Sequence, residues 1–125
     1  MILTLDFSGD IPIYQQIRNE IVKAIAEGEL KDGEKLPTVR ALAQEAGINT
    51  MTVNKAYQLL KQEGYIITDR RNGAMVQGKD RGKDDRLLQE KMRKLAGDLE
   101  LIVAEAKVNG ITEEELTKLL HEFYK

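Results

Sequence analysis

The sequence has no cysteine, a single histidine and a single serine. Without cysteine the chain forms neither disulfide bonds nor thiolate metal sites, and His121 alone does not make a zinc centre. No histidine stands near Ser8 to activate it as a nucleophile, and no glycine-rich phosphate-binding loop is present. These absences argue against an enzyme, and we expect neither a metal ion nor a cofactor.

Long apolar runs are missing too. No run approaches the roughly 18 residues of a membrane-crossing helix, and the N-terminal segment lacks the basic flank and cleavage site of a secretory signal. With 125 residues, of which 42% are hydrophobic and 32% charged, the chain has the composition of a soluble protein with one domain and a small appendage. We therefore expect a cytoplasmic protein that does not bind a membrane.

The net charge of −2 is unfavourable for a nucleic-acid binder, but the charges are unevenly distributed. Residues 1–30 hold two basic and five acidic side chains, residues 31–83 hold ten and six, and residues 84–125 hold seven and ten. The basic excess therefore lies in the central segment, where it is compatible with a phosphate-binding surface.

Apolar residues at three- and four-residue spacing predict a first helix that follows Pro12 and ends at Gly28. The mostly charged segment after it is predicted as a loop that ends in a short extended piece at Lys35 and Leu36. The apolar stripe of the predicted helix contains Tyr14, Ile17, Ile21, Val22 and Ile25.

Two short helices joined by a tight turn are predicted next. Thr38 and Asn49 are suited to cap their N-termini, and Gly47 and Gly64 are suited to end them. The buried stripe of the second of these helices is predicted to be Val53, Ala56, Tyr57 and Leu60. Its opposite face is polar and largely uncharged, as in helices that lie against base edges, and comprises Thr50, Met51, Asn54, Lys55 and Gln58.

Residues 65–68 and 74–77 are rich in β-prone side chains and flank Asn72 and Gly73. An Asn-Gly pair between two such runs predicts a hairpin with positive backbone φ at both turn residues. The order of helix, turn, helix and hairpin is that of a winged helix-turn-helix.

The charged residues 79–84 are a predicted linker. A long helix is predicted from Asp85 to about Val108, and a capping box of Thr112 and Glu115 opens a last helix. Two amphipathic helices cannot bury both apolar stripes alone, so we expect them to pack on a second subunit. The predicted dimer contacts are Leu88, Met92, Leu95, Leu99, Ile102, Val103, Leu116, Leu119, Leu120 and Phe123.

Three segments of the chain read LPTVRALA, GINTMTVNKAYQLLKQEG and RRNGAMV. They resemble the signature of the winged helix-turn-helix repressors of the GntR family, which has a Leu-Pro-Ser-x-Arg-x-Leu-Ala opening, a Gly-Val-Ser/Asn-x-x-Thr-Val segment and a Gly-x-Gly wing. The resemblance runs from about Pro12 to Val76. The short two-helix C-terminus is similar to that of the YtrA-type branch.

The resemblance implies that Arg40 contacts a phosphate or reaches toward the bases, and that Gly73 lets the wing approach DNA. It also implies contacts from the recognition helix, at Asn49, Thr50, Thr52 and Asn54. The chain departs from the pattern because Thr50 and Asn54 replace arginines of other branches, Arg71 replaces the first wing glycine and Met75 the usual aromatic. The resemblance therefore does not supply the operator sequence.

Side-chain chemistry assigns roles within this surface. The amide of Asn54 suits adenine, whereas Lys55, Arg70 and Arg71 suit phosphate. The complete predicted DNA-contacting set is Thr38, Arg40, Asn49, Thr50, Thr52, Asn54, Lys55, Arg70, Arg71, Asn72 and Gly73.

The predicted fold is mainly α with a small β-hairpin wing: a winged helix-turn-helix domain in residues 1–78 and a two-helix dimerisation region in residues 85–125. The predicted function is sequence-specific regulation of transcription by a homodimeric repressor that binds double-stranded DNA, at a pseudo-palindromic operator, through helix 49–63 and wing 65–77. The alternative is a winged-helix protein-interaction module, which the basic wing and polar helix face disfavour. A further hypothesis adds a small-molecule effector at the dimer interface.

Overall fold

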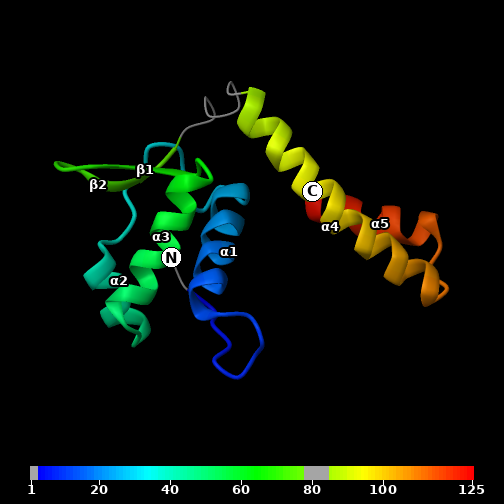
Figure 1. Cartoon of the computed structure of the whole chain (residues 1–125), viewed down its shortest axis with the longest axis horizontal. Coiled ribbons are helices and arrows are strands. Elements are labelled where there is room, and N and C mark those ends of the chain that lie inside the picture. Colours follow the sequence, from blue (N-terminus) through cyan, green and yellow to red (C-terminus); the bar gives the residue numbers. More distant parts are fainter. Residues whose placement is uncertain (1–2, 78–84) are drawn as a thin grey trace. The chain divides into compact units, whose positions relative to one another are not determined.

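The computed structural model describes residues 3–77 and 85–125, which fall into two compact units, Met1–Lys83 and Asp84–Lys125 (Figure 1). The predicted linker at 79–84 lies outside the described residues. Within the described parts, no helix is both long enough and apolar enough to cross a membrane. The prediction of a winged helix-turn-helix followed by two helices is confirmed.

The N-terminal unit is built around its third helix. It contains α1 (Ile13–Ala26), α2 (Val39–Ala46), α3 (Thr50–Gln62) and a hairpin of β1 (Ile66–Asp69) and β2 (Gly73–Val76). Figure 1 shows α1 beside α3, and α1, α2 and β1 all pack against α3. The core that these contacts bury consists of Ile17, Ile21, Ala24, Leu30, Leu36, Leu42, Ala43, Val53, Ala56, Tyr57, Leu60, Ile66 and Val76.

Local side-chain chemistry sets the ends of α2 and α3, as predicted. The Thr38 hydroxyl accepts a hydrogen bond from the Ala41 N–H at 3.0 Å, and the Asn49 side chain accepts one from the Met51 N–H at 2.7 Å. Gly47 ends α2 in the left-handed conformation with φ of 69°. The turn between the two helices therefore has a fixed geometry, which sets the direction of α3.

The wing turn differs from the prediction. Asp69 pairs with Gly73, so three residues separate the strand ends, and positive φ occurs at Gly73 but not at Asn72. The predicted positive φ is confirmed at Gly73 and wrong at Asn72. The Asp69 carboxylate accepts hydrogen bonds from the N–H and the side-chain amide of Asn72. This cap holds Asn72 within the turn in an ordinary backbone conformation.

The predicted extended piece at Lys35 and Leu36 is confirmed and pairs with the wing. Lys35 forms a β-bridge with Met75, and the Leu36 N–H donates to the Ala74 carbonyl at 2.8 Å. The Val76 N–H donates to the Glu34 carbonyl at 2.9 Å. Because β2 lies between β1 and this segment, the base of the wing is attached to the loop that leads into α2.

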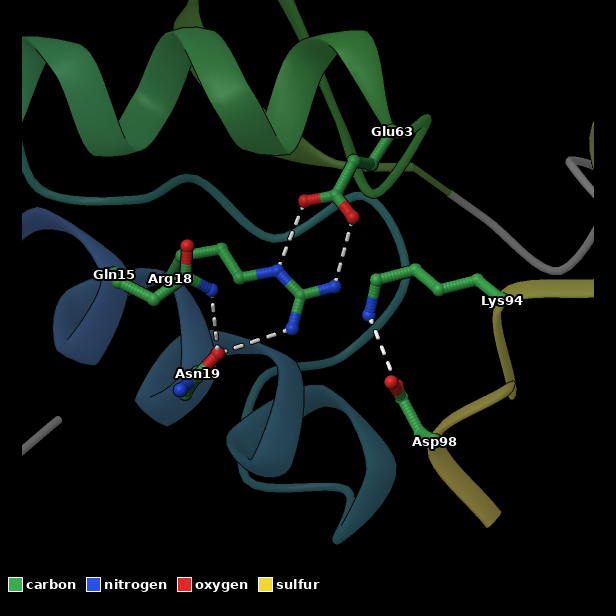
Figure 2. Close-up of polar contacts among 6 residues, drawn as sticks. All are labelled: Gln15, Arg18, Asn19, Glu63, Lys94 and Asp98. Carbon is green, nitrogen blue, oxygen red and sulfur yellow. Dashed lines mark hydrogen bonds and ion pairs between the residues drawn. The ribbon is translucent and has the colours of Figure 1, made fainter. Parts of the chain in front are cut away.

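An ion pair joins α1 to the end of α3 (Figure 2). Arg18 Nε donates to Glu63 Oε1 at 2.9 Å and Nη2 donates to Oε2 at 2.8 Å, with side chains that are 15% and 20% exposed. The remaining Nη1 donates to Asn19 at 3.1 Å, and the guanidinium lies 5.5 Å from the ring centre of Tyr65. The hydrogen bonds to Glu63 raise the pKa of Arg18. This two-point contact fixes α1 against the helix end from which the wing starts.

The C-terminal unit consists of α4 (Asp85–Val108) and α5 (Glu113–Tyr124). The predicted capping box at the start of α5 is confirmed, because the Thr112 hydroxyl accepts from the Glu115 N–H and the Glu115 carboxylate accepts from the Thr112 N–H. In the described residues of this unit, Ala106 alone is buried. The two helices therefore expose most of their apolar side chains to solvent.

We expect Glu63→Gln to lower the free energy of unfolding by about 1–3 kcal/mol, because it removes the carboxylate from a largely buried charged hydrogen bond. Urea unfolding followed by circular dichroism measures the change. The matched control is Asp98→Asn, since the Lys94–Asp98 pair on α4 is 65% and 61% exposed (Figure 2) and contributes about 0.3–0.5 kcal/mol. Equal losses in both variants would contradict a special role for Arg18–Glu63.

Candidate nucleic-acid interface

The third helix has two chemically distinct sides. Its buried stripe is the predicted one, Val53, Ala56, Tyr57 and Leu60. Every residue of the predicted opposite face, Thr50, Met51, Asn54, Lys55 and Gln58, is exposed. Met51 is 77% exposed, so its thioether side chain is available at the surface of the helix N-terminus. The first half of α3 therefore presents the short, uncharged polar side chains of Thr50 and Asn54 to solvent, beside Met51 and Lys55, where a base-reading helix would present them.

A groove with a volume of about 470 Å³ lies between α3, the wing and the start of α2. Of the predicted DNA-contacting residues, it brings together Thr38, Asn54, Arg71, Asn72 and Gly73. The others lie outside the groove: Arg40, Asn49, Thr50, Lys55 and Arg70 are exposed, and Thr52 is half-buried. The groove thus joins part of the recognition helix to the wing in one continuous concave surface.

Two cations of the groove were missed in the sequence. Lys35 and Lys61 line it together with Arg71, and the groove has no acidic lining residue. Lys61 had a local signal, because it follows Asn54 by seven residues and shares its helix face. No local sequence feature indicated Lys35, because its position in the groove follows from the β-bridge to Met75, forty residues away. Three positive charges around one groove suit a phosphodiester strand.

A buried tyrosine, Tyr57, lines this groove and bonds to the chain on its other side. The Tyr57 hydroxyl donates a hydrogen bond of 2.7 Å to the carbonyl of Pro37, directly before the N-cap of α2. Burial raises the pKa of Tyr57, so the phenol keeps its proton and stays a donor. The bond holds α2 and α3 together at the point where both line the groove.

Besides the capping residues Thr38 and Asn49, two more of the predicted contact residues have partners within the protein. Lys55 lies over the ring of Tyr14 from α1, with Nζ 4.1 Å from the ring centre. Asp69 holds Asn72 at the wing tip, and the hydrogen bond from the Asn72 N–H lowers the pKa of Asp69, as does the bond from the Asn72 amide. Both contacts leave the residue exposed while restricting its movement.

Comparison with known families identifies the N-terminal unit. Residues 13–76 match the model described as "Bacterial regulatory proteins, gntR family". Over 123 residues the chain is 34% identical to the HTH-type transcriptional repressor YtrA of Bacillus subtilis (strain 168), an overlap of 98% of this chain and 89% of that protein.

Solved structures are similar in both sequence and fold. A transcriptional antiterminator from Listeria monocytogenes EGD-e has a TM-score of 0.83 and 27% identity, covering 100% of this chain and 91% of that chain. The structure of AraR(DBD) in complex with operator ORX1 has a TM-score of 0.54 and 29% identity, covering 59% of this chain and 95% of that chain. The part shared with AraR is thus similar to a domain solved on its operator DNA.

The wing cap gives a measurable pH effect. Asp69 has a pKa below its ordinary 3.8, so its contribution to the wing turn is present above that value and is lost as the pH falls through the folded-state pKa. We expect Asn72→Ala, which removes the side-chain amide, to raise the pKa of Asp69 toward 3.8. A carboxyl NMR titration measures this value, with Asn54→Ala as the control. An unchanged Asp69 pKa would show that the side-chain bond does not form in solution.

Proposed function

The chain belongs to the GntR family of bacterial regulatory proteins, and from this we infer that it represses transcription as a homodimer bound to a pseudo-palindromic operator. As a member of this family it is a DNA-binding transcriptional regulator and not an enzyme. Its similarity to the repressor YtrA, over nearly the whole of both proteins, supports repression rather than activation.

The observation that carries the DNA-binding surface is the groove between α3 and the wing. Asn54 lies on the α3 wall of the groove and Arg71 on its wing wall. In our proposal the N-terminal half of α3 enters the major groove, and the phosphate strand beside it lies in the protein groove. Asn54 then pairs with the N6 and N7 atoms of adenine, and Arg71 contacts phosphate.

The remaining predicted contacts complete this proposal. Arg40 is exposed on α2, and Arg70 is exposed at the wing tip. In the proposed complex both add to phosphate binding. Thr50 and Thr52 supply short hydroxyl groups at the start of the recognition helix, where neighbouring bases or phosphates come within reach.

We further propose that α4 and α5 form the dimer interface. Leu95 and Leu99 on α4 are 59% and 51% exposed, and Phe123 on α5 is 81% exposed. Apolar side chains that stay this exposed in a single chain favour association. A two-fold dimer presents two recognition helices to successive major grooves, about 34–36 Å apart, which is why the operator should be an inverted repeat.

The same unit is where we place the proposed small-molecule effector. A groove of about 380 Å³ lies between α4 and α5 and is lined mainly by apolar side chains, including Ile102, Leu116 and Leu120. A volume above about 300 Å³ is sufficient for a small ligand. These side chains are also predicted dimer contacts, so in the proposed dimer the groove lies at the subunit interface. A ligand there alters the spacing of the two DNA-binding units.

The first test is selection of binding sites from randomised duplex DNA at fixed salt concentration, with Arg40→Ala as the comparison. We expect an enriched inverted repeat that the variant binds more weakly, because a phosphate contact contributes to every complex. Enrichment of a single half-site would exclude the dimeric mode. No enrichment with the wild-type protein would instead favour a protein-interaction module.

Two substitutions separate base reading from phosphate binding. We expect Asn54→Ala to lose about 1–3 kcal/mol of discrimination at one base pair. Arg71→Ala should weaken binding to all sequences alike and reduce the slope of log K against log salt by about 0.9. Fluorescence anisotropy titrations over a salt series measure both quantities. The assignment of roles is wrong if Arg71→Ala changes the sequence preference while Asn54→Ala changes only the salt slope.

The dimer proposal is tested by Leu99→Asp. A charge at the centre of the proposed interface should give monomers and sharply weaker operator binding, because a buried unpaired carboxylate opposes association. The matched control is Leu101→Asp, since Leu101 is 62% exposed and lies on the α4 side that carries Lys94 and Asp98. Analytical ultracentrifugation measures the oligomeric state. Dimers in both variants would remove α4 from the interface.

A further inference from the structure

The recognition helix carries a cation on the side that faces α1. Lys55 extends from the exposed face of α3, and its Nζ lies 4.1 Å from the ring centre of Tyr14, a residue of the first turn of α1. At this distance the ring face attracts the ammonium group. The position of the Lys55 charge therefore depends on a residue forty-one positions earlier in the chain.

The Tyr14 ring is held in position by packing within the N-terminal unit. Its ring is half-buried and packs against the core of the N-terminal unit. One helical turn further along α1, Arg18 is fixed to Glu63 through two hydrogen bonds of 2.9 Å and 2.8 Å (Figure 2). The ring is thus part of the rigid scaffold, whereas Lys55 is an exposed side chain that the ring restrains.

A helix in the major groove is bordered by a phosphate strand on each side, so residues along its middle meet bases and residues along its edges meet phosphates. One edge of α3 adjoins the groove with Lys35, Lys61 and Arg71. Lys55 stands on the edge that contacts α1. The recognition helix is therefore flanked by positive charge along both edges, from Lys35, Lys61 and Arg71 on one side and from Lys55 on the other.

We propose that Tyr14 is a positioning residue for DNA binding, and that its ring holds the Lys55 ammonium group where it meets the second phosphate strand. This inference rests on the proposed use of α3 as the recognition helix. A free lysine loses rotamer freedom when it binds a phosphate, and the ring has already removed part of that freedom. The ring contacts one side of the ammonium group, so N–H donors stay available to the phosphate.

A double-mutant cycle tests this role. The variants are Tyr14→Leu, which keeps an apolar side chain but removes the ring, Lys55→Gln, and both together; Tyr14→Phe keeps the ring. The ligand is the duplex selected with the wild-type protein, and the affinity and its salt slope are measured by anisotropy. Urea unfolding of each variant checks that the N-terminal unit stays folded.

We expect Tyr14→Leu to weaken binding about two- to fivefold with little change in salt slope, and Tyr14→Phe to bind like the wild type. Lys55→Gln should reduce the slope by about 0.9. In the Lys55→Gln background, Tyr14→Leu should have no further effect, because the ring acts through the ammonium group.

Three results would overturn the inference while leaving the proposed function intact. Equal weakening by Tyr14→Leu in both backgrounds would mean a purely structural role. Unchanged affinity would mean that the ring does not position Lys55 for DNA. Tighter DNA binding by Tyr14→Leu would mean that the ring holds the Lys55 ammonium group away from the phosphate. Absence of sequence-specific binding by the wild-type protein would overturn the proposed function and this inference together.

Discussion

The N-terminal unit depends on one constraint: one face of α3 must be buried in the core while the opposite face stays exposed to solvent. α1, α2 and β1 all pack on its buried stripe, which includes Val53, Ala56 and Leu60. Because these neighbours share one helix, the polar face cannot rotate without moving the whole core. A surface that reads base edges needs this kind of rigidity, since small shifts of its side chains break the hydrogen-bond geometry.

Polar contacts at the margins of the core add directional precision to this packing. The Tyr57 hydroxyl fixes the chain just before α2, and the Arg18–Glu63 pair fixes α1 against the C-terminal end of α3. The Asp69 carboxylate orders the wing turn. Tyr57, Pro37 and Asn72 all line the groove of the proposed DNA surface, so two of these three contacts order the binding surface directly. The Arg18–Glu63 pair acts outside the groove, at the helix end that precedes the wing.

Local features of the fold could be predicted from the sequence because their causes are local. The N-caps at Thr38 and Asn49 and the capping box at Thr112 each involve residues within three positions of one another. Helix periodicity likewise indicated which side of α3 is buried. The conformation of Asn72 in the wing turn was predicted wrongly, because the Asn-Gly pattern gave no weight to the carboxylate of Asp69, three residues before Asn72.

Contacts between distant segments lay beyond sequence reasoning. The sequence shows no periodic pattern for the pairing of Lys35 with Met75, or for the contact of Tyr14 with Lys55. The place of Lys35 in the groove and the restraint on Lys55 are therefore visible only in the folded structure. The DNA-contacting set and the dimer contacts stay predictions that the binding experiments address.

The segment that pairs with β2 also protects the protein from self-association through its sheet. An isolated hairpin has two open edges, each of which offers unpaired N–H and carbonyl groups to strands of other molecules. Here residues 33–36 occupy the β2 edge, and β1, the remaining edge in the described part of the sheet, is four residues long and ends in Asp69. A short strand with a charged end is a poor template for strand addition. The wing therefore projects from the unit without exposing an edge long enough to seed aggregation.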